Sequence, residues 1–141
     1  MTLTEFLLAR IAEDEDGAHA ATLGPWRWIG DRDKDEASLY GPRTPDDKCG
    51  PPVISASGMH TEGYIYVDAS DAEHIARWHP ARVLAECEAK RRIIDVHLNG
   101  EAWCDHCSGG EHMGNPGGCP TLRLLALPHA DHPDYDQAWR V

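Results

Sequence analysis

Hydrophobic and polar positions near the start of the chain follow the period of a helix. Phe6 and Ile11 come shortly after a threonine that stands three residues before a glutamate, Thr2 and Glu5. A threonine and a glutamate at this spacing form a capping box, because each side chain binds a backbone N–H that the first helical turn leaves unpaired. We therefore expect a first helix over about residues 3–21, ended by a glycine-proline pair.

From residue 25 onward the pattern changes to the alternation that is typical of strands. Residues 25–41 contain two short extended runs on either side of a polar turn and predict a hairpin. Segments 53–55 and 64–67 are rich in valine, isoleucine and tyrosine and predict further strands. Together these segments indicate a small antiparallel sheet of three or four strands.

Helical periodicity returns in the second half of the chain. Ser70 and Glu73 form a second capping box, and we expect a short helix from there to about residue 78. A long amphipathic helix over residues 80–98 follows, and we expect it to cover the sheet.

Two shorter helical segments close the chain. Thr121 is expected to cap a helix over residues 122–127, and a last helical turn lies near residues 134–139. An N-terminal helix, a small antiparallel sheet, a long helix and short C-terminal helices predict an α+β fold, and we expect a single domain over residues 1–141.

Composition limits the class of protein further. The chain has 141 residues, of which 41% are hydrophobic. No stretch approaches the length of about 18 apolar residues that a membrane span needs, and the N-terminus does not read as a secretory signal. We therefore expect a cytoplasmic protein whose cysteines stay reduced.

The charge of the chain argues against direct binding of nucleic acid. The net charge is -11, which disfavours broad contact with phosphates. The basic run Lys90-Arg91-Arg92 stands beside Glu88 and Asp95 and suits a solvated helix face. A nucleic-acid-associated or DNA-mimicking regulator is kept as an alternative, in which the acidic segments imitate the charge of DNA.

Three of the five cysteines lie in the last third of the chain. Cys104 and Cys107 form a Cys-x2-Cys knuckle, and Cys119 follows after a glycine-rich loop. This spacing is typical of zinc, since two thiolates on one tight turn reach a single tetrahedral ion. We therefore expect a zinc-knuckle subregion over about residues 97–127.

The fourth zinc ligand is expected to be a histidine. His97 lies in the last turn of the long helix, on the same face as Ile94, and would tie the knuckle to that helix. His106 and His112 are the alternatives. The predicted metal ligands are His97, Cys104, Cys107 and Cys119.

Three thiolates and one imidazole form a closed shell without a position for a catalytic water, so we expect a structural zinc ion and no catalytic residue. His60-Thr61-Glu62, ahead of the cysteine knuckle, is similar to the His-x-Glu motif of zinc deaminases. However, Glu62 is followed by Gly63 and a strand-like run, where that chemistry needs a helix. A zinc-dependent hydrolase or deaminase-like enzyme is therefore the alternative.

The remaining cysteines and most tryptophans are expected to have structural roles. Cys87 lies on the apolar stripe of the long helix and should be a small core residue, whereas Cys49 should be a free surface thiol. Four tryptophans are expected to fill core rather than form a binding platform. They are Trp26, Trp28, Trp78 and Trp103.

Several short motifs are spread along nearly the whole chain. They are Leu3-Thr4-Glu5-Phe6-Leu7, Gly24-Pro25-Trp26, His74-Ile75-Ala76-Arg77, Pro80-Ala81-Arg82-Val83-Leu84, Glu88-Ala89-Lys90-Arg91-Arg92, Cys104-x2-Cys107, Cys119-Pro120-Thr121-Leu122-Arg123-Leu124-Leu125-Ala126 and Asp131-His132-Pro133-Asp134-Tyr135. With these motifs the chain resembles a family of small proteins from actinomycetes and their phages, known as a domain of unknown function. The resemblance implies a histidine before the cysteine pair and a cysteine before Pro-Thr-Leu-Arg, in agreement with His97 and Cys119 as ligands, and it supplies no activity.

The sequence thus predicts a small zinc-binding protein that acts by contacting a protein partner. The closed metal shell favours a binding protein over an enzyme, and the resemblance favours an accessory factor of a phage or prophage.

Overall fold

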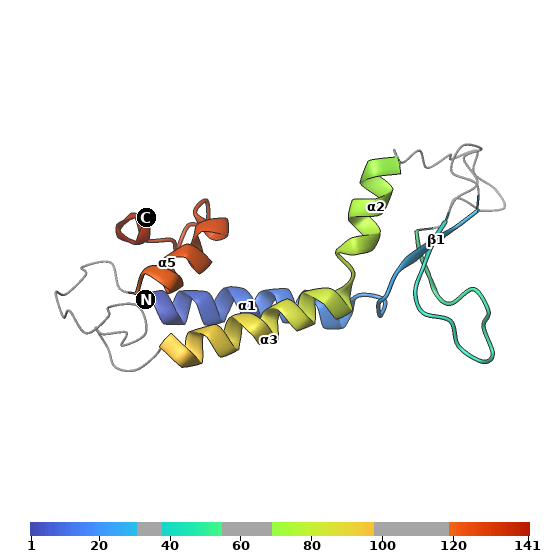
Figure 1. Cartoon of the computed structure of the whole chain (residues 1–141), viewed down its shortest axis with the longest axis horizontal. Helices are drawn as coiled ribbons and strands as arrows, with labels where there is room; N and C mark the ends of the chain where they lie inside the picture. The colour runs from blue at the N-terminus through green and yellow to red at the C-terminus, as the bar shows by residue number, and fades with distance from the viewer. Residues whose placement is uncertain (31–37, 55–68, 98–118) are drawn as a thin grey trace. The chain divides into compact units, whose positions relative to one another are not determined.

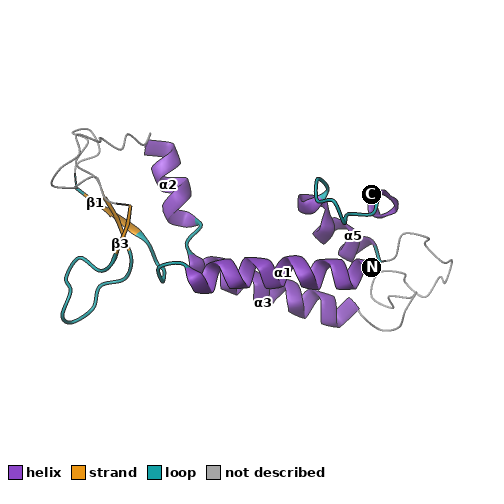
Figure 2. Cartoon of the chain, turned by 180° about the vertical axis from the view of Figure 1, so that it is seen from behind, coloured by secondary structure: helices purple, strands orange, loops and turns teal. Residues whose placement is uncertain are grey.

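The computed structural model describes residues 1–30, 38–54, 69–97 and 119–141. Within these ranges four α-helices and a three-stranded antiparallel sheet make an α+β fold, as the sequence predicts (Figures 1 and 2). The chain divides into two compact units, one formed by Met1–Asp14 with Glu86–Val141 and the other by Glu15–Ala85. The single domain over residues 1–141 stays a prediction.

The first helix, α1, runs over Leu3–Ala20 and opens with the predicted capping box. The backbone N–H of Thr2 donates to Oε2 of Glu5 at 2.7 Å, and the backbone N–H of Glu5 donates to Oγ1 of Thr2 at 3.2 Å. The first of these bonds is the main reason that the pKa of Glu5 is lowered, because it stabilises the carboxylate.

The long helix α3 runs over Pro80–His97, and its second half lies beside the first half of α1 (Figure 1). The thiol of Cys87 is fully buried and lies 3.9 Å from the carbonyl oxygen of Ile11. Ile94, two turns further on, is also fully buried. Cys87 is therefore a core residue, as predicted. The second half of this helix packs on α1, and the expectation that the helix covers the sheet stays a prediction.

The chain ends in α5 over Pro120–Ala126, followed by the 3-10 turns η2 over Leu127–His129 and η3 over Gln137–Trp139. The prediction that Thr121 caps this helix is wrong. Cys119 is the N-cap and Pro120 is the first helical residue, because proline has no N–H to leave unpaired and its fixed φ suits the first turn.

The core of this unit is centred on the fully buried ring of Phe6. Four aromatic or imidazole rings from the C-terminal segment surround it, with ring centroids between 5.2 and 6.2 Å from its own. They belong to His129, His132, Tyr135 and Trp139. Edge contacts of this kind stabilise aromatic pairs beyond their buried area. Phe6 therefore fastens the C-terminal segment to α1.

The core around Phe6 contains a buried hydroxyl group, that of Tyr135. Within the described residues the hydroxyl of Tyr135 is buried and has no hydrogen-bond partner. A buried, unpaired hydroxyl costs about 1–3 kcal/mol of stability. We therefore expect Tyr135→Phe to leave the free energy of unfolding unchanged or to raise it by up to about 1 kcal/mol, as measured by urea denaturation. A loss of more than about 1 kcal/mol would mean that the hydroxyl has a partner.

The second unit contains the sheet, in the order β1-β2-β3. Strand β1 over Arg27–Ile29 pairs with β2 over Ser38–Tyr40, which confirms the predicted hairpin. Strand β3 over Pro52–Ile54 pairs with the other edge of β2. The further strand expected at 64–67 lies outside the described residues. Leu39 of the central strand is fully buried and anchors the sheet.

Arg27 fixes the loop that joins β2 to β3. Its guanidinium donates to the carbonyl oxygen of Gly41 at 2.6 Å and to that of Cys49. Gly50 in the same loop has a φ of +82°, and an added Cβ would lie 2.5 Å from the carbonyl oxygen of Pro42. The loop is therefore ordered although it is largely exposed. The thiol of Cys49 is free and exposed, as predicted.

Helix α2, over Ala69–Arg77, contacts strand β1 of the sheet. The indole N–H of Trp28 on β1 donates to the carbonyl oxygen of Ala72 at 2.7 Å, and Ala72 is fully buried. The capping box predicted Ser70 as the residue just before this helix, but the helix begins at Ala69 and includes Ser70.

The tryptophans do not share one role. Trp26 and Trp28 are half-buried, and the indole N–H of Trp26 donates to the carbonyl oxygen of Thr22 at 2.7 Å. Trp78, which the sequence predicts to be core, is 42% exposed. That prediction is wrong. Trp78 follows the last residue of α2, and the guanidinium of Arg82 lies over its ring, 4.4 Å from the centroid. Trp103 lies outside the described residues.

Candidate metal centre

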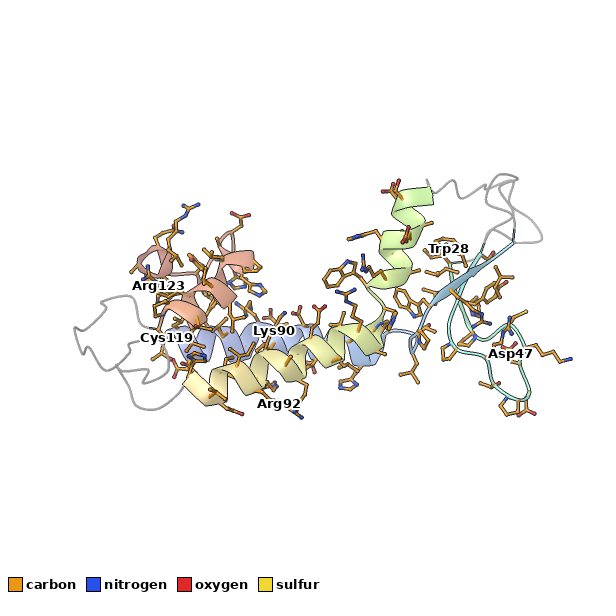
Figure 3. The ribbon with its side chains drawn as sticks, viewed as in Figure 1. Trp28, Asp47, Lys90, Arg92, Cys119 and Arg123 are labelled. Carbon is orange, nitrogen blue, oxygen red and sulfur yellow. The ribbon has the colours of Figure 1, made fainter. Side chains whose placement is uncertain are left out.

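The structure brings two of the four predicted zinc ligands together. His97 is the last residue of α3. Cys119, which is labelled in Figure 3, is the N-cap residue of α5. Although 22 positions separate them in sequence, Sγ of Cys119 lies 3.5 Å from Nδ1 of His97. Cys104 and Cys107 lie outside the described residues.

This separation agrees with the geometry of a shared zinc ion. With Zn–S near 2.3 Å, Zn–N near 2.0–2.1 Å and a tetrahedral angle, two ligand atoms on one ion lie about 3.6 Å apart. The observed sulfur-to-nitrogen distance is 3.5 Å. A single ion could therefore contact both atoms with little movement of either helix. Without a metal, the same two atoms can share a thiol–imidazole hydrogen bond.

Packing on both sides holds the pair in place. His97 follows the buried Ile94 by one turn of α3 and is itself half-buried. On the other side, Leu122 is buried in α5, and the side chain of Arg123 donates to the carbonyl oxygens of Trp139, at 3.0 Å, and Arg140. The backbone N–H of Arg123 also donates to the carbonyl oxygen of Cys119 at 3.0 Å. The candidate ligands are thus positioned by the ends of two anchored helices.

A complete metal shell would need ligands from elsewhere in the chain. In the part of the chain that the structure describes, no group of three His, Cys, Asp or Glu side chains is placed to hold a metal ion. The two cysteines of the predicted knuckle would supply the missing sulfur atoms. The alternative histidines, His106 and His112, also lie outside the described ranges.

Sequence reasoning missed a second polar cluster in this unit. Arg10 of α1 is buried, and its Nη1 lies 2.9 and 2.8 Å from the two ring nitrogens of His132. Its Nε donates to Oε2 of Glu13 at 2.8 Å, and its guanidinium lies 5.2 Å from the ring centroid of Phe6. The four-residue spacing of Phe6 and Arg10 places both on one helix face. That spacing is the signal that could have identified Arg10 as a core residue.

Burial lowers the pKa of the nearby His129 below its ordinary value of 6.5. The negative charge of Asp14 raises this pKa, whereas the charges of Lys90, Arg10 and His132 lower it further. Between the lowered pKa and 6.5 the folded chain therefore binds fewer protons at His129 than the unfolded chain does. The resulting stability is present above pH 6.5 and is lost as the pH falls through the folded pKa.

We therefore expect the free energy of unfolding, measured in urea, to fall as the pH is lowered from about 7.5 to about 5. His129→Gln should reduce this dependence because it removes the titrating group. His19→Gln, at an exposed position near the end of α1, is the matched control and should leave the dependence unchanged. An identical pH dependence in His129→Gln and wild type would contradict the assignment.

The basic run on α3 is paired with acidic side chains. Nζ of Lys90 lies 3.7 Å from a carboxylate oxygen of Asp14, and Nε of Arg92 lies 2.8 Å from one of Glu88. These pairs agree with the expectation of a solvated helix face. The candidate enzyme residues, His60 and Glu62, lie outside the described residues.

The fold and the candidate centre define a small α+β protein in which a thiol–imidazole pair joins two helix ends. No helix among the described residues is long and apolar enough to cross a membrane. The chain belongs to a family of unknown function, DUF6221, whose model matches residues 1–141. No curated protein and no solved structure matches the chain.

Proposed function

We propose that the chain is a zinc-binding protein in which His97, Cys104, Cys107 and Cys119 hold one structural ion. The observation that carries this proposal is the distance of 3.5 Å between Sγ of Cys119 and Nδ1 of His97. It is close to the value of about 3.6 Å for two ligands of one tetrahedral zinc ion. The sequence supplies the other two thiolates at the spacing of a zinc knuckle.

The ion would stabilise the last part of the chain. Helix α5 has seven residues, too few for a helix to be stable without tertiary contacts. A metal that binds the residue before α5 and the last residue of α3 would fix both helix ends. Because three thiolates and one imidazole leave no position for a substrate, the role of the ion is structural.

The protein would act as an accessory factor that binds another protein in the cytoplasm of a phage-infected or prophage-carrying cell. Two observations support this. The motifs resemble those of proteins from actinomycetes and their phages, and the described surface exposes the large ring of Trp78. The ion pairs of Lys90 and Arg92 do not favour the nucleic-acid alternative.

The zinc content of the purified chain and its variants tests the proposal. Elemental analysis should find about one zinc ion per wild-type chain, and less in His97→Ala and Cys119→Ser because each variant loses a ligand. Cys49→Ser and His19→Ala change exposed residues of the other unit and are the matched controls. Both controls should keep the wild-type content.

Two results would contradict the proposal. A wild-type chain without zinc would exclude the metal centre altogether. If His97→Ala kept its full zinc content while Cys119→Ser lost zinc, His97 would not be a ligand, and the fourth ligand would be His106 or His112.

A further inference from the structure

Two histidines of the C-terminal segment lie against α1, beside a buried arginine. We call residues 127–141 the C-terminal strap, which contains η2 and η3. The imidazoles of His129 and His132 both meet the ring of Phe6 edge-on, with centroids 6.2 and 5.7 Å from its own. One turn further along α1, Nη1 of Arg10 lies 2.9 Å from Nδ1 and 2.8 Å from Nε2 of His132. The strap is thus held to α1 partly through titratable rings.

The contacts of His132 fit a neutral ring and not a protonated one. The backbone N–H of Asp134 donates to Nδ1 at 3.1 Å, and the guanidinium of Arg10 can only donate. In an imidazolium both nitrogens carry a proton, so no acceptor remains for either donor. Protonation would also place a second positive charge within 2.9 Å of Nη1 of Arg10. Uptake of a proton therefore turns attractive contacts of the strap into repulsive ones.

Two carboxylates near this contact oppose the repulsion only in part. Oδ2 of Asp134 lies 4.0 Å from Nδ1 of His132, and Glu13 accepts hydrogen bonds from the guanidinium of Arg10. Both carboxylate side chains are more than half exposed, whereas the side chain of Arg10 is 8% exposed. Because solvent screens exposed charges more strongly than buried ones, the effect of Arg10 outweighs that of the carboxylates.

The neighbouring His129 responds in the same direction. Its pKa is lowered mainly by burial, and the positive charges of Lys90, Arg10 and His132 add to this effect, while Asp14 raises the pKa. A protonated His129 is therefore also disfavoured while the strap is packed. The charged groups that face the two rings are Arg10, Glu13 and Asp14 of α1, Lys90 of α3 and Asp134 of the strap.

We propose that the contact between the C-terminal strap and α1 is a pH-sensitive switch, in which protonation of His132 and His129 releases the strap. Histidine is the side chain whose charge ordinarily changes between about pH 5 and pH 8. Release uncovers Phe6, which is fully buried, together with the buried Tyr135 and Trp139. The aromatic surface that α1 and the strap present to solvent therefore depends on pH.

Hydrogen exchange of the full-length protein at about pH 7.5 and about pH 5 tests the switch. The backbone N–H groups of His132, Tyr135 and Trp139 donate within the strap, each at 2.9 Å. Their exchange, corrected for its intrinsic pH dependence, reports on the strap directly. On acidification the protection of residues 127–141 should fall by about tenfold in the wild type, and that of α3 should fall less.

Two variants remove the expected repulsion. His132→Gln cannot take up a proton, and Arg10→Met removes the positive charge but keeps a long side chain, so each should reduce the fall in protection to less than about twofold. His19→Gln changes an exposed histidine near the end of α1 and is the matched control, which should keep the wild-type response. Circular dichroism at about pH 7.5 shows whether each variant is folded, and His132→Gln carries the test if Arg10→Met does not fold.

Two results would overturn the inference. One is unchanged protection of the wild-type strap at about pH 5, and the other is a response of His132→Gln equal to that of the wild type. Acid also protonates zinc ligands, but His132→Gln keeps all four proposed ligands, so a loss of protection caused by zinc release would persist in this variant. A response that is present in the wild type and absent in His132→Gln supports the switch whether or not the chain holds zinc.

Discussion

Phe6→Ala is expected to lower the free energy of unfolding by about 3–5 kcal/mol, because truncating a buried aromatic ring leaves a cavity that the surrounding side chains do not fill. Phe6 is fully buried and contacts four rings of the C-terminal segment. The loss is a large fraction of the 5–15 kcal/mol that is typical of a domain. Urea denaturation followed by circular dichroism measures it.

A milder variant keeps this prediction testable if Phe6→Ala does not fold. Phe6→Leu retains most of the apolar volume and should cost about 1–2 kcal/mol. Leu124→Ala is the control, since Leu124 is 56% exposed and its truncation should cost less than about 0.5 kcal/mol. A loss in Phe6→Ala no greater than that in Leu124→Ala would show that the C-terminal segment does not pack on this ring.

Chelation of zinc is expected to destabilise the same unit. A ligand that binds only the folded chain adds about 2.7 kcal/mol at a hundred times its dissociation constant. For a chain of this length the loss of that energy corresponds to a fall in melting temperature of about 10 °C. Differential scanning calorimetry with and without a chelator measures the change.

Matched variants separate zinc from other effects of the chelator. Cys49→Ser should lose as much stability on chelation as the wild type. Cys119→Ser should start lower and respond little, because it has already lost a ligand. Hydrogen exchange should increase mainly in α5 and at the C-terminal end of α3. Equal melting temperatures for the wild type with and without chelator would contradict a structural ion.

Local sequence signals predicted the helices well because they depend on neighbouring residues. Thr2 and Glu5 cap α1 through side chains three positions apart, and such a bond can be read from spacing alone. The predicted start of α5 was wrong because one local signal was weighed above another. Pro120 at the first helical position was a stronger signal than the capping preference of Thr121.

Contacts between distant segments could not be predicted from spacing. Arg10 and His132 lie 122 positions apart, and only the packing of the C-terminal segment on α1 brings them together. The exposure of Trp78 likewise depends on tertiary packing, which its position directly after α2 in the sequence does not determine. The zinc hypothesis requires His97 and Cys119 to lie close together whatever the intervening chain, and the distance of 3.5 Å between them agrees with that requirement. The zinc site itself stays a prediction.

The most direct test of the metal centre is X-ray absorption at the zinc edge of the full-length protein. The proposal predicts three sulfur atoms at about 2.3 Å and one nitrogen at about 2.0–2.1 Å. His97→Ala should lose the nitrogen contribution, and Cys119→Ser should lose one sulfur. A wild-type shell with fewer than three sulfur atoms, or one made entirely of nitrogen and oxygen, would contradict the proposed ligands.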